Sequence, residues 1–396
     1  MHEDKEPRMT AEDLSQDWRA WRKQVLRSAK LVVIKVGSAV LTSDQGLDLR
    51  VVNRLVDQVA ALHDQGRKII LVSSGAVAAG RGFLFTAGGQ LTLPEKQAAA
   101  AVGQSRLMHS YDEAFERYKK VTAQILLTRD DLRSRHRFLN ARNTFATLLE
   151  NGVIPVVNEN DTVVVRELKF GDNDLLASLL LNVVKADLFI SLTTADGVYS
   201  GNPELSSGAF KYECIPNIKQ IDISTTCQGS TSSGSGGMHS KLLSARRACQ
   251  LGVPTLIVSG NVSFVLEKVF AGQDLGTWVM PEERAIPRRK YWLAYNLDPL
   301  GEVIVDAGAR DALILRGKSL LPIGVRSVQG CFEPGDLIRI LDPNGRELGV
   351  GLTNFSSEDL QKICGCKSSD IERILNAHVP HMEAVHRDNL LLDAAH

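Results

Sequence analysis

The chain is short of the features that mark secreted, membrane and nucleic-acid-coating proteins. Its six cysteines are too few and too scattered for a disulfide framework, so we expect free thiols. The longest mostly apolar stretch, residues 175–184, is about half of the roughly 20 residues that a bilayer span requires. Lysine plus arginine and aspartate plus glutamate both number 46, so no overall field attracts a polyanion. We therefore expect a cytoplasmic protein without a membrane partner.

Motifs for several common chemistries are also absent. The nine histidines form no HExxH pattern, and Cys364 and Cys366 lack the spacing of a zinc-binding pair, so we assign no structural metal. No strand–GxGxxG–helix unit indicates a dinucleotide site, and no GxSxG elbow indicates a hydrolase. These absences exclude the usual sequence signatures of zinc proteases, dehydrogenases and α/β-hydrolases.

What the chain does contain is an alternation of short β-branched runs with longer helical patterns, beginning at Leu31. Its 396 residues are enough for two domains with proper cores. The alternation predicts an α/β fold with an open, mostly parallel sheet sandwiched by helices. The expected strands are 31–37, 68–73, 121–127, 153–158, 187–192 and 253–258, and the clearest helices are 50–65, 95–119, 135–151, 174–185 and 239–251.

The two ends of the chain have a different character. Near the start, Leu14, Trp18, Trp21 and Val25 recur at helical spacing, which predicts a short amphipathic helix in an otherwise disordered extension. Beyond a charged, proline-containing segment, short strands at close spacing, among them residues 312–317, predict a small β-rich domain. The expected division is an extension (1–28), an α/β domain (29–280), a linker (281–295), a β-rich domain (296–378) and a tail (379–396).

Residues that follow strands carry most of the chemical information, because ligands of open α/β sheets bind outside the carboxyl ends of the strands. Lys35, Gly37 and Ser38 end the first expected strand, where a lysine beside a glycine suits a phosphate group. A turn glycine beside a solvated lysine is the alternative. Ser74 follows the second strand and either receives an anion at a helix start or is an ordinary N-cap.

Two polar clusters and one glycine-rich segment complete the candidates. Residues 158–161 (NEND) and 171–174 (GDND) offer oxygens to an ammonium group or to hydrated Mg²⁺, or else are turn and cap residues. Residues 229–241 (GSTSSGSGGMHSK) form either a nest of backbone N–H groups for phosphate oxygens or a flexible linker. Two lysines, a nest and carboxylates together favour phosphoryl transfer.

In their order along the chain, these motifs resemble the amino acid kinase family. Within it, the likeness is to members that phosphorylate the γ-carboxylate of L-glutamate with ATP, at the start of proline synthesis. Residues 301–325 and 330–340 resemble a PUA domain, a β-rich module shared with RNA-modifying enzymes. The motifs that carry the family likeness are VIKVGSAVL (33–41), SSGAVAAGR (73–81), AAVGQSRLM (100–108), LLTRDD (126–131), RFLNARNT (137–144), VIPVVNENDTV (153–163), GDND (171–174) and GSGGMHSK (234–241).

The resemblance implies a role for each candidate residue. Lys35 and Lys241 would be catalytic, while Ser74, Asp161 and Asn173 would bind glutamate. Mg²⁺ would be held by the ATP phosphates and water rather than by protein ligands. A homo-oligomer and feedback inhibition by proline are also implied. The nucleotide-binding set would comprise Lys35, Gly37, Ser38, Thr193, Thr194, Ser235, Gly236, Gly237, Met238 and Lys241.

Two positions depart from the family pattern, and two other functions stay open. Thr194 replaces a common aspartate, which puts base or ribose recognition in question, and Ala39 removes one hydroxyl from the usual Gly-Thr-Ser loop. The alternatives are an acetylglutamate or aspartate kinase, and an RNA-binding protein acting through the PUA domain. Residues 296–378 contain nine basic and twelve acidic residues, a net charge of −3, so we expect no nucleic-acid partner.

Overall fold

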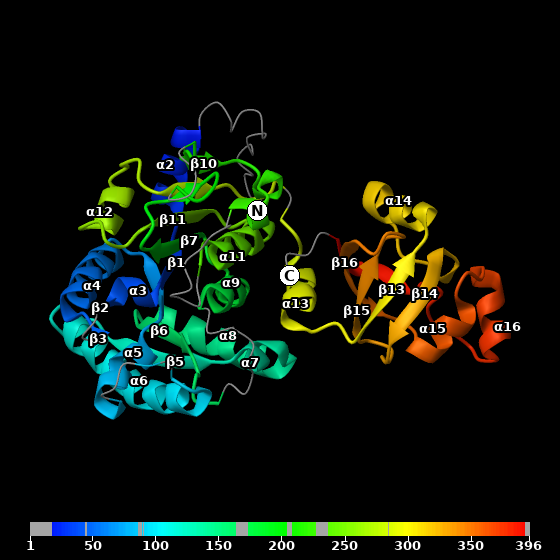
Figure 1. Cartoon of the computed structure of the whole chain (residues 1–396), viewed down its shortest axis with the longest axis horizontal. Coiled ribbons are helices and arrows are strands. Elements are labelled where there is room, and N and C mark those ends of the chain that lie inside the picture. Colours follow the sequence, from blue (N-terminus) through cyan, green and yellow to red (C-terminus); the bar gives the residue numbers. More distant parts are fainter. Residues whose placement is uncertain are drawn as a thin grey trace. The chain divides into compact units, whose positions relative to one another are not determined.

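The computed structural model describes residues 18–43, 46–85, 89, 91–163, 173–203, 208–226, 237–283 and 285–392. The chain forms two compact units, Met1–Ala285 (unit 1) and Ile286–His396 (unit 2), which Figure 1 shows. Unit 1 is built on an eight-stranded sheet and unit 2 on a five-stranded sheet. The predicted fold class, a mostly parallel α/β sheet followed by a β-rich module, is confirmed.

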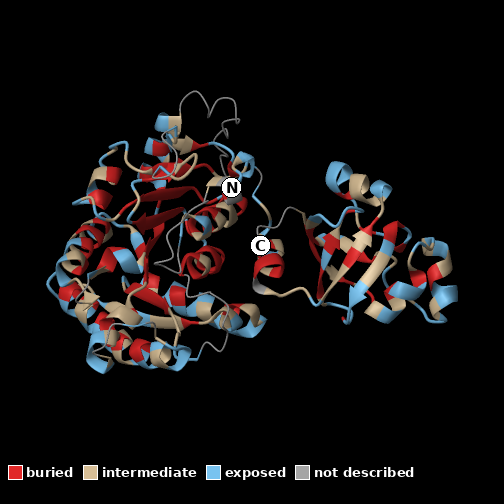
Figure 2. Cartoon of the chain, in the orientation of Figure 1, coloured by how far each residue is buried: buried red, intermediate tan, exposed pale blue. Residues whose placement is uncertain are grey.

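Six adjacent strands of unit 1 run parallel, in the order β11-β7-β1-β4-β6-β5. At one edge, β12 joins β11 in the antiparallel direction and β10 joins β12. The central strands are buried aliphatic runs, as expected for a sheet covered on both faces (Figure 2). All six predicted strands are confirmed. The bounds are β1 Leu31–Val36, β4 Lys68–Ser73, β5 Thr122–Leu127, β6 Ile154–Glu159, β7 Leu188–Thr193, β10 Cys214–Ile215, β11 Thr255–Ser259 and β12 Thr277–Val279.

Helices cover both faces of this sheet (Figure 1). On one face α4 contacts β4 and α12, and on the other α9 contacts β1 and α11 contacts β11. Side-chain caps stabilise the first turns of two helices. Asp48 accepts from the Arg50 N–H at the start of α4, and Thr92 forms a capping box with Glu95 at the start of α6. The five predicted helices are confirmed with small shifts at their ends. The bounds are α3 Ser38–Leu41, α4 Leu49–Asp64, α5 Ala76–Leu84, α6 Leu93–Glu116, α7 Arg129–Arg133, α8 Arg135–Glu150, α9 Asn173–Val184, α10 Ile223–Thr226, α11 Met238–Gln250 and α12 Val265–Phe270.

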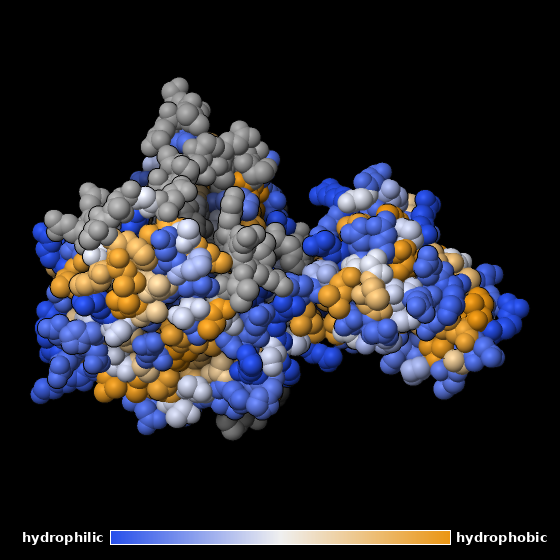
Figure 3. Space-filling model, turned by 60° about the horizontal axis from the view of Figure 1, so that its bottom comes forward, coloured by the Kyte–Doolittle hydropathy of each residue, from blue (hydrophilic) through white to orange (hydrophobic). Residues whose placement is uncertain are grey.

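Two short ribbons, absent from the sequence analysis, lie beside the main sheet. One pairs β2 (Thr42–Ser43) with β3 (Gly46–Leu47), and the other pairs β8 (Val198–Tyr199) with β9 (Lys211–Tyr212). On the face of unit 1 that Figure 3 shows, apolar and hydrophilic side chains are interspersed. The exposed apolar side chains of unit 1 include Phe83 and Leu84 at the end of α5. Such a mixed surface is ordinary for a protein in water.

The predicted amphipathic helix near the start of the chain is confirmed as α2 (Trp18–Ser28). Its Trp18, Trp21 and Val25 pack against the core of unit 1, and the Trp21 ring meets Trp278 edge-on at 6.2 Å between centroids. Arg22 is buried, donates to the Gly272 carbonyl at 2.7 Å and pairs with Asp274. The helix therefore docks on its own unit, while Leu14 lies outside the described residues.

Unit 2 is a mixed sheet in the order β14-β13-β15-β16-β17 with short helices around it. β13 runs parallel to β15 and antiparallel to β14, and an apolar cluster that includes Phe332 and Ile338 fills its core. The bounds are α13 Arg288–Asn296, β13 Gly301–Val305, α14 Ala307–Arg316, β14 Val325–Gly330, β15 Leu337–Leu341, β16 Glu347–Thr353, α15 Ser357–Ile363, α16 Ile371–Leu375 and β17 Val385–Leu392.

Three segments of unit 2 differ from expectation. Of residues 312–317, predicted as a strand, 312–316 belong to helix α14 and Gly317 is its C-cap at φ +56°, while Asp306 caps the start of the helix. The segment expected as a linker contains α13, which contacts β16 and β17. The expected tail contains β17, which completes the sheet by antiparallel pairing with β16.

Candidate active site

Two buried lysines share one buried carboxylate near the carboxyl end of the sheet. Lys35 reaches it from β1, Lys241 from the first turn of α11, and Asp174 from the first turn of α9. Lys35 Nζ lies 2.7 Å from Asp174 Oδ1, and Lys241 Nζ lies 3.1 Å from Asp174 Oδ2. Each side chain exposes 4% of its surface or less. The Ser240 hydroxyl also donates to Oδ2, at 2.8 Å.

The electrostatics of this group favour an additional anion. Burial alone raises the pKa of Asp174, but the charges of Lys35 and Lys241 and the hydrogen bonds outweigh burial and hold that pKa well below its usual value. Asp174 is therefore ionised at neutral pH and faces two lysines. The amino ends of α9 and α11 meet here and add partial positive charge. A phosphate group fits such a site.

A network of amide side chains extends from this group toward α6. Asn173, at the start of α9, donates Nδ2 to Ser74 Oγ at 2.7 Å and to Asn158 Oδ1 at 2.9 Å. Asn158, on β6, donates Nδ2 to Gln104 Oε1 at 2.9 Å. The backbone N–H of Glu159 donates to the same Asn158 Oδ1, at 2.9 Å. Side chains from three elements, α9, β6 and α6, and from the loop before α5 are thus fixed relative to one another.

The network borders a pocket of about 410 Å³ between α6 and the ends of β5 and β6. Apolar side chains line part of it, among them Ala76 of α5, Met108 of α6 and Leu126 of β5. The polar lining residues are Gln104, Ser105, Gln124, Glu159, Asn160, Asp161 and Thr162. Burial raises the pKa of Asp161. A nearby positive charge would favour the ionised form of this carboxylate, so Asp161 is suited to an ammonium group. The volume is that of a small-molecule site.

The residues expected to contact a nucleotide end or follow elements at the same sheet edge. Gly37 follows β1, and its N–H donates to the carbonyl of Leu192 at 3.1 Å. Ser38 begins α3 and is exposed, whereas Thr193 ends β7 and is buried. Gly37 and Ser38 thus follow β1, and Thr193 ends β7, the strand that pairs with β1 beside Lys35.

Two further residues expected to bind the nucleotide, Gly237 and Met238, lie at the start of α11. Gly237 is the N-cap and makes no side-chain cap bond, and Met238 is the first helical residue. The first N–H groups of a helix have no intrahelical partners, so this end can receive phosphate oxygens. Ser235 and Gly236 lie outside the described residues.

Thr194 is exposed, and its carbonyl accepts a hydrogen bond from Ser259 Oγ at 3.2 Å. Asp196 is the nearest carboxylate that follows it in sequence. That carboxylate accepts from the Tyr199 hydroxyl at 3.0 Å and lies 3.3 Å from Lys211 Nζ. Asp196 therefore already has partners of its own.

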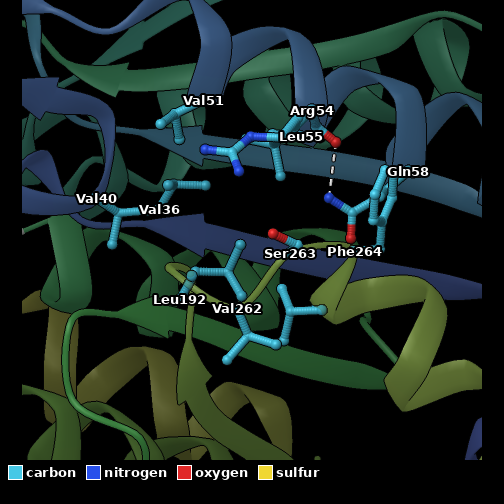
Figure 4. Close-up of a pocket in the computed structure, with 12 residues that line it drawn as sticks. Val36, Val40, Val51, Arg54, Leu55, Gln58, Leu192, Val262, Ser263 and Phe264 are labelled. Atoms are coloured by element: carbon cyan, nitrogen blue, oxygen red, sulfur yellow. Dashed lines mark hydrogen bonds between the residues drawn. The ribbon is translucent and has the colours of Figure 1, made fainter.

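A second pocket lies on the opposite face of the sheet and is apolar for the most part (Figure 4). Val36 and Leu192 line it, next in sequence to Lys35 and Thr193, which occupy the alternate positions along β1 and β7. Its volume is about 20 Å³, which is room for about one water molecule. It is too small to be the substrate site.

Three residues that organise this site were not expected to do so individually: Asp174 and Asn158 were candidates only as members of polar clusters, and Gln104 had no assigned role. Asp174, Asn158 and Gln104 lie within the GDND, NEND and AAVGQSRLM motifs. One sequence feature could have identified Gln104 as a site residue: it is a polar residue that follows the small residues AAVG (100–103) within an expected helix. Among the described residues, no cluster of His, Cys, Asp or Glu side chains could hold a metal ion, and no helix is long and apolar enough to cross a bilayer.

Comparison with known proteins gives two matches that together cover most of the chain. Residues 30–259 match the amino acid kinase family, and residues 301–375 match the PUA domain. The glutamate 5-kinase of Maridesulfovibrio salexigens is 56% identical over 94% of this chain and 99% of its own length. That of Nitratidesulfovibrio vulgaris is 57% identical over 96% and 99%. Among solved structures, the UMP kinase of Bacillus anthracis aligns at 16% identity with a TM-score of 0.45, over 64% of this chain and 97% of that one.

Proposed function

Because the chain belongs to the amino acid kinase family, we propose that it transfers the γ-phosphoryl group of ATP to the γ-carboxylate of L-glutamate. The products would be L-glutamyl 5-phosphate and ADP, the first step of proline biosynthesis. This is the activity of relatives that are 56–57% identical over nearly their whole length. The observation that carries the proposal is the Lys35–Asp174–Lys241 group, which the amide network connects to a pocket of amino-acid size.

Phosphoryl transfer needs positive charge around the oxygens of the transferred group, and little covalent chemistry from the protein. Lys35 and Lys241 supply that charge from two different elements. Asp174 holds both ammonium groups in place before the substrates arrive, so little reorganisation is needed at the moment of transfer. Lys35 binds the ATP phosphates, and Lys241 neutralises charge that develops on the γ-phosphoryl group.

The acceptor requires orientation rather than activation. The γ-carboxylate of glutamate is already ionised at pH 7, so no general base is required. Asn173 donates to Ser74 Oγ and so positions that hydroxyl, which keeps its own hydrogen and donates it to this carboxylate beside Asp174 and the lysines. Asp161, at the pocket, pairs with the α-ammonium group. The substrate would thus extend from the pocket to the lysine pair.

Mg²⁺ fits this site as an ion carried by the nucleotide. Bound between phosphates, the ion would neutralise part of their charge. Asp174 is engaged by two lysines, and the described residues hold no three-ligand cluster, so we assign the ion to phosphate oxygens and water. Self-association, inhibition by proline and a cytoplasmic location stay predictions from the sequence resemblance.

The proposal is tested by ATP-dependent hydroxamate formation with Mg²⁺ and three acceptors: L-glutamate, L-aspartate and N-acetyl-L-glutamate. Turnover with L-glutamate well above the other two is expected. Turnover confined to aspartate or N-acetylglutamate would move the chain to another branch of the family, and no turnover with any acceptor would refute the proposed reaction. The Lys241→Ala variant, prepared in parallel, gives the background of contaminating kinases.

A further inference from the structure

The donors and acceptors of the amide network are ordered by a single backbone group. The N–H of Glu159 can only donate, so the Asn158 atom that it contacts must be the carbonyl oxygen Oδ1. The other end of that side chain is then Nδ2, which donates to Gln104, so Gln104 must present Oε1 to it. Asn173 must likewise turn Nδ2 toward Asn158 Oδ1. One N–H therefore determines the orientation of all three amides.

This order leaves one free donor and one free acceptor at the two ends of the network. Gln104 Nε2 and Asn173 Oδ1 are both buried and have no hydrogen-bond partner among the described residues. An unsatisfied buried polar atom costs stability, so native proteins rarely keep one without a reason. A ligand that brings an acceptor to Gln104 would satisfy the first of them.

We propose that Gln104 binds substrate, with Nε2 donating to the α-carboxylate of L-glutamate. The inference rests on the proposed function and identifies the part of the substrate that this side chain recognises. Gln104 and Asp161 line the same pocket, so a carboxylate and an ammonium group on one carbon find a donor and an acceptor there. The γ-carboxylate belongs at the other end, where the Ser74 hydroxyl has a hydrogen to donate and the lysines paired with Asp174 supply positive charge.

The consequence is selectivity for a free α-carboxylate. A site built to hydrogen-bond one substrate group discriminates strongly against analogues that cannot make the bond, because its buried polar atom is then left unpaired. L-Isoglutamine keeps the γ-carboxylate and the α-ammonium group of glutamate but carries a neutral α-amide. The wild-type enzyme should therefore use L-isoglutamine much less efficiently than L-glutamate.

The decisive variant is Gln104→Glu, which keeps an oxygen for Asn158 Nδ2 and replaces the donor with an acceptor. A lost hydrogen bond to a charged group predicts a KM for L-glutamate raised about 10- to 100-fold, with kcat within about threefold and KM for ATP unchanged. The new carboxylate accepts from the α-amide of isoglutamine. The ratio of kcat/KM for glutamate to that for isoglutamine should fall at least tenfold.

The matched control is His109→Glu, which adds a carboxylate to an exposed position of the same helix outside the pocket. It should leave both the KM values and the substrate ratio unchanged. Should Gln104→Glu fail to fold, as judged by thermal unfolding, Gln104→Met removes the donor without adding charge and should also reduce the preference for glutamate.

The outcomes separate this inference from the proposed function. If the wild type phosphorylates no glutamate, the proposed function fails. If it phosphorylates glutamate but uses isoglutamine equally well, or if the folded Gln104 variants keep the wild-type ratio, the function stands and Gln104 has no contact with the α-carboxylate.

Discussion

Gly103 of α6 lies so close to Ala76 of α5 that a Cβ atom added to Gly103 would be 1.8 Å from the Ala76 carbonyl oxygen. The approach is reciprocal, because a Cβ on Gly80 would be 1.9 Å from the carbonyl oxygen of Ala99. The two helices therefore touch backbone to backbone. Ser74 lies just before α5 and Gln104 just after Gly103, so this contact sets the spacing between two sides of the amide network.

Gly103→Ala should force the two helices apart. We expect the free energy of unfolding to fall by about 1–3 kcal/mol, because added volume in a packed contact is costly. We also expect a higher KM for glutamate. Gly82→Ala on α5 is the matched control, because its Cβ would meet nothing within 4 Å, and helix propensity predicts unchanged or slightly higher stability. Denaturant unfolding of both variants measures the difference; equal stability would show that the helices adjust freely.

Lys241→Ala should act on the transition state more than on ground-state ATP binding. We expect kcat to fall about 10²-fold or more, as for the loss of one preorganised electrostatic donor. Lys68→Ala, at an exposed position at the opposite end of β4, removes the same charge and should leave kcat unchanged. An undiminished kcat in Lys241→Ala would remove this lysine from the mechanism.

Asp174→Asn should destabilise the protein at neutral pH, because it leaves two buried lysines without their carboxylate. Breaking a buried ion pair costs on the order of 3–5 kcal/mol. The folded-state pKa of Asp174 is lowered, so its contribution is present above the unfolded pKa of about 4 and is lost as the pH falls through the folded value. The Tm difference from the wild type should therefore shrink in acid. A difference that stays constant below pH 4 would contradict the ion-pair account.

Asp161→Asn should raise the thermal stability of the protein and weaken its binding of glutamate. Burial raises the folded-state pKa of Asp161, so the folded state binds the proton more tightly, and stability declines as the pH rises from the unfolded pKa through the folded one. At pH 7 the neutral amide avoids this penalty, and Tm should rise on the order of 1–3 °C. The KM for glutamate should rise at least about tenfold through loss of the ammonium partner. A lower Tm with an unchanged KM would refute both expectations.

Thr194→Asp should introduce the carboxylate that the family resemblance leads us to expect at this position. We expect KM for ATP to fall several-fold, with kcat within about threefold. A contact that stabilises bound ATP and the transition state equally changes KM alone. Asp196→Asn tests whether that residue already fills the role; its bonds to Tyr199 and Lys211 predict no change. Saturation curves for ATP and GTP measure both variants. Unchanged nucleotide KM in both would show that this segment does not touch the nucleotide.

The sequence by itself determined the six parallel strands and the five long helices of unit 1, and it supplied the candidate site residues as predictions. Runs such as LVVIKV (31–36) are short, β-branched and followed by helical periodicity, which local propensity and burial translate directly into a parallel sheet. Parallel strands place their carboxyl ends along one edge, so Lys35 and the residues after β6 could be assigned to one site from order alone. Residues 312–317 misled because an apolar run fits a helix or a strand, although Asp306 and Gly317 carried the capping signals that decide for α14.

Only the tertiary structure decided which side chains share a partner. Asp174 binds Lys35 and Lys241, which are 139 and 67 positions away in sequence, and no local pattern encodes that meeting. The pairing of β17 with β16 was missed for the same reason, because a strand's partner is fixed by distant packing. The Glu159 N–H on β6 orients Asn158, and Asn158 in turn orients the Gln104 amide so that its Nε2 stays free to donate. Hydrogen bonds and ion pairs depend on atomic separations of a few ångströms, and folding sets these only when helices and sheet pack together.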